Sequence, residues 1–226
     1  MSTNMSTNMS AADGGSPGIR RSGEHALLVE TGGLRLSHRL DALLRAERPA
    51  GVAEIVPGPE TLLVVAPGAD LGRLSALLSK LLAESAAEAR ARPEGTGGDA
   101  GEVVTIPVVY DGADLESVAE LAGLTVDEVI ARHTASELVV GWLGFAPGFA
   151  YLTGLDPVLR VPRLETPRTC VPAGSVAVAG PYSAVYPAAS PGGWRLLGRT
   201  EARVWDVAAD PPSMLRPGTR VRFEAV

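Results

Sequence analysis

The residues best suited to chemistry lie in one glycine- and proline-rich stretch, residues 144–194. Arg163 and Arg168 stand there five positions apart, among prolines and with few other charges nearby. Two guanidinium groups that point into one cleft can each hold a carboxylate or phosphate through paired hydrogen bonds. The alternative is that each arginine bonds loop carbonyls or pairs with Glu165, and so only fixes the turns. The spacing indicates an anion site and favours Arg168, inside the sequence TPRT, as its ligand-binding member.

Other residues of this stretch are candidates for the wall of the same site. Aromatic side chains there serve most simply as core and pocket wall. A serine that follows a glycine either bonds a ligand or caps its own turn. Glycines are expected where φ is positive or where chains approach closely. The candidate substrate-binding residues are therefore Arg163, Arg168, Ser175, Phe149, Tyr151, Gly148, Gly174 and Trp194. No acid–base pair emerges, so the catalytic residues stay unassigned.

Composition argues against several classes of protein. A net charge of −6 and a pI near 5.2 disfavour binding to nucleic acid by phosphate neutralisation. No apolar run approaches the roughly 18 residues of a membrane span. The single cysteine, Cys170, excludes an internal disulfide and suits a reducing cytoplasm. The three histidines (His25, His38 and His133) lie far apart, so no metal site is expected. His133 is placed at a helix end, where its protonated form would favour the helix dipole.

Two segments precede the second half of the chain. Residues 1–23 begin with a duplicated polar tetrapeptide and are predicted to be a disordered tail, whose removal leaves the thermal midpoint unchanged. Residues 24–110 read as β-α-β-β-α-β, with a last strand at about 102–110, which is the order of a ferredoxin-like unit. Ser37 and Asp70 stand where the N-caps of its two helices belong.

The segment 111–136 predicts two short helices separated by Gly123. Asp114 and Thr125 occupy N-cap positions, and Glu128 completes a capping box. A DNA-reading helix-turn-helix is one interpretation, but the many acidic residues favour a helical pair that packs on a sheet. Short strands at regular spacing then predict a closed or nearly closed β-structure. After a buried strand at ELVVGWLGF, these strands are expected at GSVAVAG, SAVYP, WRLLGRT, ARVWDV and TRVRFEAV.

Several motifs together resemble those of a known family. GFAPGFAYLTGLDP, VPRLETPRTCVPAGSVAVAG, VYP and SPGGWRLLGRT occur in that order, and IPVVYDGADLESVAELAGLTVDEVIARHT precedes them. The order and spacing are similar to those of the family that groups the B subunit of bacterial ATP-dependent 5-oxoprolinase, the sporulation-kinase inhibitor and subunit 1 of allophanate hydrolase. The same fold occurs in biotin-dependent urea carboxylase. The resemblance covers about residues 24–226.

The resemblance implies an α+β protein with a ferredoxin-like domain at 24–110 and a cyclophilin-like β-barrel domain at 111–226. It further implies pairing with a homologous C subunit, and an A subunit that completes an enzyme opening 5-oxoproline, a lactam, to glutamate with ATP hydrolysis. The chain has no P-loop, so ATP is expected to bind at another kind of site or on a partner. The chain alone is expected to be inactive. The family also leaves open an inhibitor of a sensor histidine kinase and a component of the allophanate or urea pathway.

The chain departs from the family pattern at two places. Ala150 replaces the second proline of PGFPY, and Gly180 to Ala184 read GPYSA where members have GGQTG. Only Tyr182 and Ser183 remain to take the place of the Gln-Thr pair. Either the ligand differs or this loop is structural.

Overall fold

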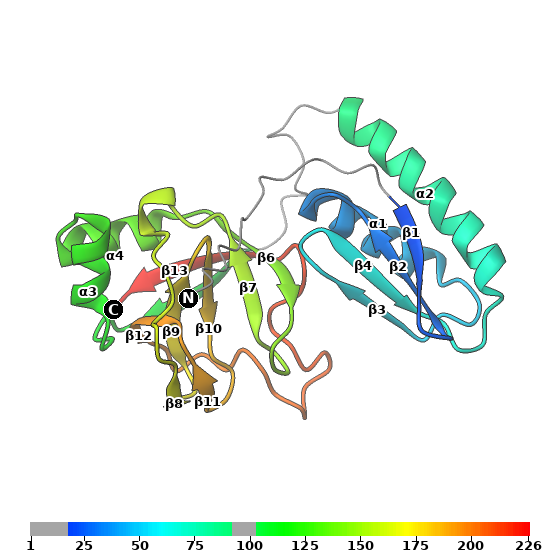
Figure 1. Ribbon diagram of the computed structural model, residues 1–226. Coiled ribbons are helices and arrows are strands. Elements are labelled where there is room, and N and C mark those ends of the chain that lie inside the picture. The colour runs from blue at the N-terminus through cyan, green and yellow to red at the C-terminus, as the bar shows by residue number, and fades with distance from the viewer. Residues whose placement is uncertain (1–17, 92–102) are drawn as a thin grey trace, which may run out of the picture. The chain divides into compact units, whose positions relative to one another are not determined.

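The computed structural model describes residues 18–91 and 103–226, which form two compact units. The first unit contains residues 18–56 and 60–91, and the second contains the remaining described residues. Each unit builds its own sheet and its own hydrophobic core (Figure 1).

The first unit consists of a four-stranded sheet and two helices that pack on it. The strand order is β1-β2-β4-β3, and β2 runs antiparallel to both β1 and β4. Alternate residues of β2 and β4 are buried in one core with the helices. The leucine spacing of the second helix is confirmed, since Leu71, Leu74, Leu78, Leu81 and Leu82 are buried. The elements are β1 (Gly18–Ser22), β2 (Ala26–Glu30), α1 (Leu34–Glu47), β3 (Glu54–Pro57), β4 (Thr61–Val65) and α2 (Leu71–Ala91).

Both predictions about the edge of this sheet are wrong. Residues 18–22, inside the expected tail, form β1 and pair with β2, while residues 1–17 lie outside the described residues. The expected last strand, β5 (Val103–Val108), lies instead in the sheet of the second unit, parallel to β13 (Arg220–Ala225). A strand joined to β2 by a short turn at Gly23 loses less loop-closure entropy than one that returns after α2. The edge of β2 is therefore covered by β1.

One of the two helix caps predicted in the first unit is confirmed. Asp70 Oδ1 accepts hydrogen bonds from the backbone N–H groups of Gly72 and Arg73, at 2.8 and 3.1 Å, and caps α2. Ser37 is not a cap, because it lies inside α1, where its buried hydroxyl bonds the Thr31 hydroxyl at 2.6 Å.

We expect a chain that begins at Glu24 to unfold several degrees below one that begins at Gly18. Removal of β1 exposes the backbone groups of β2 and takes Ile19 away from the core of the first unit. Thermal unfolding of the two truncated chains, followed by circular dichroism, measures the difference. Equal midpoints would mean that β1 contributes nothing to the stability of this unit.

The second unit is built on a seven-stranded sheet with a separate two-stranded ribbon. The order in the large sheet is β12-β9-β10-β7-β6-β13-β5, and β8 pairs with β11 in the ribbon. The elements are β5, α3 (Leu115–Ala122), α4 (Val126–Ala135), β6 (Leu138–Leu143), β7 (Ala150–Thr153), η1 (Pro157–Leu159), β8 (Arg168–Val171), β9 (Ser175–Ala179), β10 (Tyr182–Val185), β11 (Ser190–Gly192), β12 (Arg195–Arg199) and β13.

The large sheet is nearly closed on itself. Its two outer strands, β12 and β5, are joined by Arg199, the last residue of β12, and Val109, just beyond β5, whose backbones exchange two hydrogen bonds of 2.9 Å. The strands enclose a core that includes Ile106, Val140 and Leu152. The structure thus confirms a mixed α/β chain with a barrel-like sheet in its second half.

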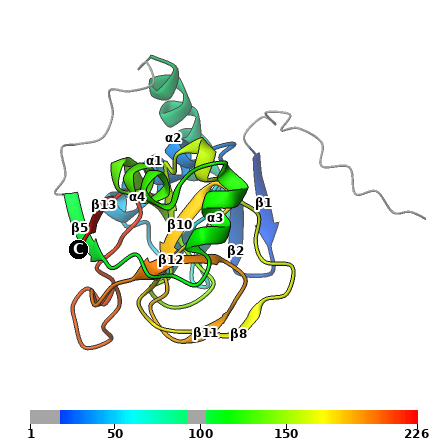
Figure 2. The ribbon, with the colours of Figure 1, turned by 90° about the vertical axis from the view of Figure 1, so that its left-hand side faces the viewer.

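The helical pair packs on this sheet, as the acidic composition predicts. Thr125 and Glu128 form the expected capping box at the start of α4, and Gly123 ends α3 in the left-handed conformation. Helix α3 contacts β12, and α4 contacts β13. Figure 2 shows the pair against the sheet and the β8–β11 ribbon at the lower end of the same unit.

One predicted strand is absent from the described second unit. Residues 202–207, ARVWDV, lie in a loop that contributes only an isolated bridge between Trp205 and Ser213. The loop instead places Trp205 against Gly148, in the turn between β6 and β7. Trp205 thus packs on this turn, and its segment does not pair as a further strand of the sheet.

Candidate functional site

Three of the candidate residues lie together in a cluster of aromatic rings. Phe149 is buried at the centre and meets four rings edge-on, with ring centroids 5.2 to 5.5 Å apart. Such contacts fix the orientation of each ring. We call this group, formed by Phe145, Phe149, Tyr151, Tyr186 and Trp194, the aromatic cluster. Phe149, Tyr151 and Trp194 are thus neighbours, although they span 45 positions of the sequence.

Gly148 and Gly174 shape the backbone around the cluster. Both have positive φ, +77° and +79°, where a side chain is strained. A Cβ on Gly148 would overlap Trp205, and a Cβ on Gly174 would overlap the carbonyl oxygen of Thr200. Their place in the site is therefore that of turns that permit close approach.

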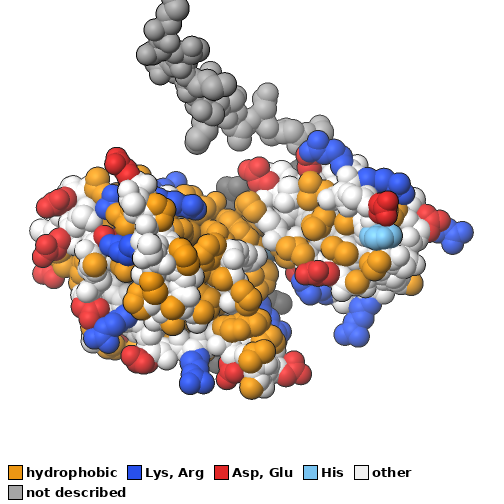
Figure 3. All heavy atoms as spheres, turned by 60° about the horizontal axis from the view of Figure 1, so that its bottom comes forward, with side chains coloured by type: hydrophobic (Ala, Val, Ile, Leu, Met, Phe, Trp, Pro, Cys, Tyr) orange, Lys and Arg blue, Asp and Glu red, His pale blue; other side chains and the backbone are white. Residues whose placement is uncertain are grey.

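Phe145 is the most exposed ring of the cluster, with 62% of its surface open to solvent. Its φ of 66° is unusual for a residue with a side chain and marks a strained backbone of the kind that gathers at functional sites. Val207 and Met214 are other exposed apolar residues of the second unit. Figure 3 shows hydrophobic side chains gathered on this unit on the side facing the viewer. No pattern in the sequence signals the strained backbone at Phe145.

Arg168 forms an ion pair with Asp114, the residue that directly precedes α3. Its Nη2 donates to Asp114 Oδ1 at 2.8 Å, and Asp114 Oδ2 accepts the backbone N–H of Leu196 at 2.7 Å. Asp114 is buried and is the N-cap residue of α3, as predicted, but its side chain makes no capping hydrogen bond. The Nη1 atom of Arg168 is buried and has no hydrogen-bond partner among the described residues.

Arg163 lies above the indole of Trp194, with its guanidinium carbon 5.9 Å from the ring centroid. This is the geometry of a cation–π contact. In the part of the chain that the structure describes, Arg163 forms no ion pair, and Glu165 does not bind it. The exposed guanidinium is thus fixed against the aromatic cluster while its N–H groups stay available.

Ser175 and Tyr182 differ in their surroundings. Ser175 is buried at the start of β9, and its carbonyl accepts the backbone N–H of Tyr186 at 2.9 Å. Its hydroxyl bonds no other residue in the described ranges, so turn capping by its side chain is not observed. Tyr182 lies at the rim of the aromatic cluster, edge-on to Tyr151 at 5.8 Å.

Tyr186 is the residue of this region that the candidate set omits. It stands in the VYP motif directly after β10, and its ring is almost fully buried between Phe149 and the β8–β11 ribbon. Burial raises the pKa of the hydroxyl, while the backbone N–H of Trp194 and the charge of Arg163 act in the opposite direction. The hydroxyl is therefore protonated at neutral pH. The VYP motif was the available signal.

Ser183 belongs to a buried polar chain and not to the ligand face. Its hydroxyl donates to the carbonyl of Ala177 at 3.2 Å and lies 2.9 Å from His133 Nε2. His133 Nδ1 lies 2.7 Å from the hydroxyl of Tyr110. Because the Ser183 hydroxyl donates its proton to the Ala177 carbonyl, the Nε2 of His133 must be the donor to Ser183. Nδ1 then accepts a hydrogen bond from the Tyr110 hydroxyl. Position 183 of the GPYSA segment is thus structural.

His133 lies in the last turn of α4, as predicted, but a helix-dipole role would need its protonated form. The side chain is fully buried and stacks on Phe223 with ring centroids 4.7 Å apart. Burial lowers its pKa to about 3, because the charged form cannot be solvated there. His133 is accordingly a neutral member of the core at physiological pH.

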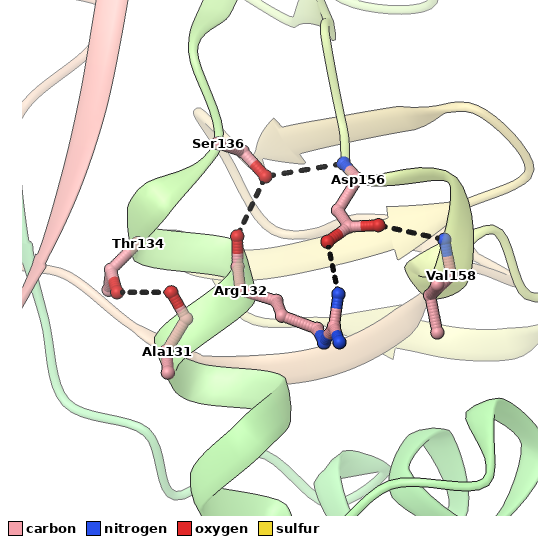
Figure 4. A network of polar contacts seen from close by, with 6 residues as sticks. All are labelled: Ala131, Arg132, Thr134, Ser136, Asp156 and Val158. Atoms are coloured by element: carbon pink, nitrogen blue, oxygen red, sulfur yellow. Dashed lines mark hydrogen bonds and ion pairs between the residues drawn. The ribbon is translucent and has the colours of Figure 1, made fainter.

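A second polar network fixes the turn that leads to Arg163. Arg132, near the end of α4, pairs with Asp156 at 2.9 Å, and Asp156 Oδ1 caps η1 by accepting the Val158 N–H at 3.0 Å (Figure 4). Ser136 accepts the Asp156 N–H at 3.2 Å and donates to the Arg132 carbonyl at 2.8 Å. The bond from the Val158 N–H, as the largest cause, and the bond from Arg132 lower the pKa of the Asp156 carboxyl.

The cavity found in the second unit is not at the aromatic cluster. It encloses about 290 Å³ and is lined by residues 134–138 and 220–222 together with Val103. None of the candidate residues lines it. The described residues contain no group of His, Cys, Asp or Glu able to hold a metal ion, and none of their helices is long and apolar enough to cross a membrane.

Residues 17–215 match the family described as carboxyltransferase domain, subdomain C and D. The chain is 42% identical over 177 residues to the B subunit of the 5-oxoprolinase of Escherichia coli O157:H7, and the alignment covers 76% of this chain and 77% of that protein. A distant match to the urea amidolyase of Saccharomyces cerevisiae is 22% identical.

Solved structures share the fold. The crystal structure of TTHA0988 superimposes with a TM-score of 0.76 at 36% identity, covering 90% of this chain and 40% of that longer chain. The urea carboxylase of Kluyveromyces lactis superimposes with a TM-score of 0.68 at 20% identity, covering 96% of this chain and 23% of that chain. This chain thus spans well under half the length of either solved chain.

Proposed function

We propose that this chain, which belongs to the family of the carboxyltransferase domain, subdomains C and D, is the B subunit of a 5-oxoprolinase. The observation that carries the proposal is the 42% identity to such a B subunit over about three quarters of both chains. The complex would open the lactam ring of 5-oxoproline to glutamate and couple this to ATP hydrolysis.

The surface around the aromatic cluster suits such a substrate. 5-Oxoproline offers a carboxylate, a polar lactam carbonyl and a small ring. The exposed ring of Phe145 provides an apolar face, and Arg163, above the buried Trp194 indole, provides an unpaired charge. Arg168 shares its charge with Asp114, so we assign it the second contact with the carboxylate, through its free Nη1.

The remaining candidates take supporting places in this proposal. Phe149 holds the exposed ring of Phe145 in position, and Tyr151 packs edge-on against the buried Trp194 ring. Gly148 and Gly174 shape the turns, and Ser175 lies beneath the cluster through its backbone bond with Tyr186. We also propose that the second unit is a cyclophilin-like barrel, and that the first unit is a ferredoxin-like fold in which β1 replaces the outer strand.

Partners and ATP complete the proposal. A homologous C subunit and an A subunit would form the complex in the cytoplasm, and the exposed apolar side chains of the second unit support such association. The sequence contains no P-loop, so we assign ATP binding to a partner. The urea-pathway alternative depends on matches of 20–22% identity, of which the solved structure supports the fold alone.

We expect 5-oxoproline-dependent ATP hydrolysis only when this chain is co-expressed with the A and C components of the complex. Release of glutamate and phosphate is measured for the purified complex, for the chain alone and for a complex made without this chain. The chain alone should show no turnover, because the coupled reaction needs a nucleotide site and the sequence contains no P-loop. Turnover by the isolated chain, or equal activity without it, would overturn the proposed role. Allophanate as a second substrate tests the alternative pathway.

A further inference from the structure

The hydroxyl of Tyr186 lies at a junction of three backbone segments. Gly192 stands opposite Arg168 in the β8–β11 ribbon, and a Cβ on Gly192 would overlap the Tyr186 hydroxyl oxygen. The oxygen therefore packs directly on the ribbon at the position of Arg168. The backbone N–H of Trp194 faces the same oxygen, and Arg163 covers the Trp194 ring.

Three side chains near this junction can donate hydrogen bonds, and one of them has a buried donor atom without a partner. Among residues 18–91 and 103–226, nothing accepts the proton of the Tyr186 hydroxyl. The Nη1 of Arg168 is buried without a partner, and Arg163 has no counter-ion in those ranges. The carboxylate that binds Arg168, that of Asp114, accepts from Arg168 Nη2 and from the N–H of Leu196.

An unpaired buried donor costs free energy, so such donors are normally satisfied by protein, water or ligand. Here the Nη1 of Arg168 is such a buried donor, whereas Arg163 is exposed, and both guanidinium groups carry positive charge. A ligand that satisfies them must bring acceptor oxygens and negative charge. A planar carboxylate fits this set, since it accepts from guanidinium and hydroxyl groups at once.

We propose that Tyr186, Arg163 and the Nη1 of Arg168 form a carboxylate site, in which the Tyr186 hydroxyl donates a hydrogen bond to one carboxylate oxygen. Tyr186 is thereby a substrate-binding residue in addition to the candidates above. The identification of the ligand as 5-oxoproline rests on the proposed function, whereas the carboxylate site itself does not. The raised pKa of Tyr186 supports its role as a donor, because burial keeps the proton on the hydroxyl.

The test measures binding of three probes to the full chain by isothermal titration calorimetry. 5-Oxoproline carries both carboxylate and lactam, 2-pyrrolidone carries the lactam alone, and cyclopentanecarboxylate carries the carboxylate alone. The Tyr186→Phe variant removes one oxygen and keeps the ring. It should bind both carboxylates about 10- to 100-fold more weakly, the loss expected for one hydrogen bond to a charged group, and bind 2-pyrrolidone as before.

Tyr182→Phe is the matched control, because Tyr182 lies at the rim of the same cluster. It should bind all three probes like the unmodified chain. If Tyr186→Phe folds poorly, Arg163→Gln replaces it, since Arg163 is exposed and its loss does not disturb the core. That variant should also weaken binding of both carboxylates selectively.

Unchanged carboxylate binding by folded Tyr186→Phe, or by Arg163→Gln, overturns the site. Equal loss of 2-pyrrolidone would place the hydroxyl on the lactam carbonyl and also overturn it, as would the absence of carboxylate binding in the unmodified chain. Binding of cyclopentanecarboxylate that depends on Tyr186, in a protein whose complex does not hydrolyse 5-oxoproline, would support the site and refute only the proposed function.

Discussion

Replacing Asp114 with alanine should lower the free energy of unfolding by about 3–5 kcal/mol, the usual cost of breaking one side of a buried ion pair. Asp114 is 6% exposed and serves two partners, the guanidinium of Arg168 at 2.8 Å and the N–H of Leu196 at 2.7 Å. Its removal leaves the charge and the N–H unpaired together. Urea unfolding of the full chain at neutral pH measures the change.

The control is Asp111→Ala, which removes a carboxylate from an ion pair of similar length. Asp111 and Arg199 are 2.9 Å apart, but both side chains are about half exposed. This change should cost only about 0–1 kcal/mol, because solvent screens the pair. Equal losses in the two variants would mean that burial of the Asp114–Arg168 pair does not determine its contribution.

A double variant separates the charge from the packing. Arg168→Met together with Asp114→Ala leaves no unpaired charge, so its loss of stability should be smaller than the sum of the single losses. Additive losses would show that Asp114 and Arg168 contribute independently.

Acidification should destabilise the protein through His133, and His133→Gln should reduce that sensitivity. The ordinary pKa of histidine is 6.5, and burial lowers that of His133 to about 3 in the folded chain. Between these values the unfolded chain binds a proton that the folded chain excludes. The free energy of unfolding therefore falls with falling pH, by about 1.4 kcal/mol for each pH unit from this group alone.

Urea unfolding at several pH values between 6.5 and 3 measures the slope. Carboxylates contribute to the slope in both chains, so the difference between them isolates His133. His25→Gln is the control for the loss of a histidine side chain as such, since His25 is exposed in the turn before β2. A slope in His133→Gln as steep as in the unmodified chain would contradict the neutral, buried state of His133.

The sequence determined those features that depend on neighbours within a few turns of the chain. The leucine spacing of α2, the Asp70 cap and the Thr125–Glu128 capping box are local patterns, and the structure has each of them. The motif order also determined the family. Such features follow from side-chain period and from hydrogen bonds to adjacent backbone, which a single sequence displays directly.

The tertiary structure alone decided which distant residues meet. The partner of β5 is β13, at the far end of the chain, and no local pattern favours that strand over the sheet of the first unit. Asp114 reaches Arg168 across 54 positions, and His133 reaches Ser183 across 50. Local patterns predict a capping side chain at Asp114 and a helix-dipole role for a protonated His133. In the folded chain both side chains are buried and form long-range hydrogen bonds instead, because a buried polar group without a partner is costly.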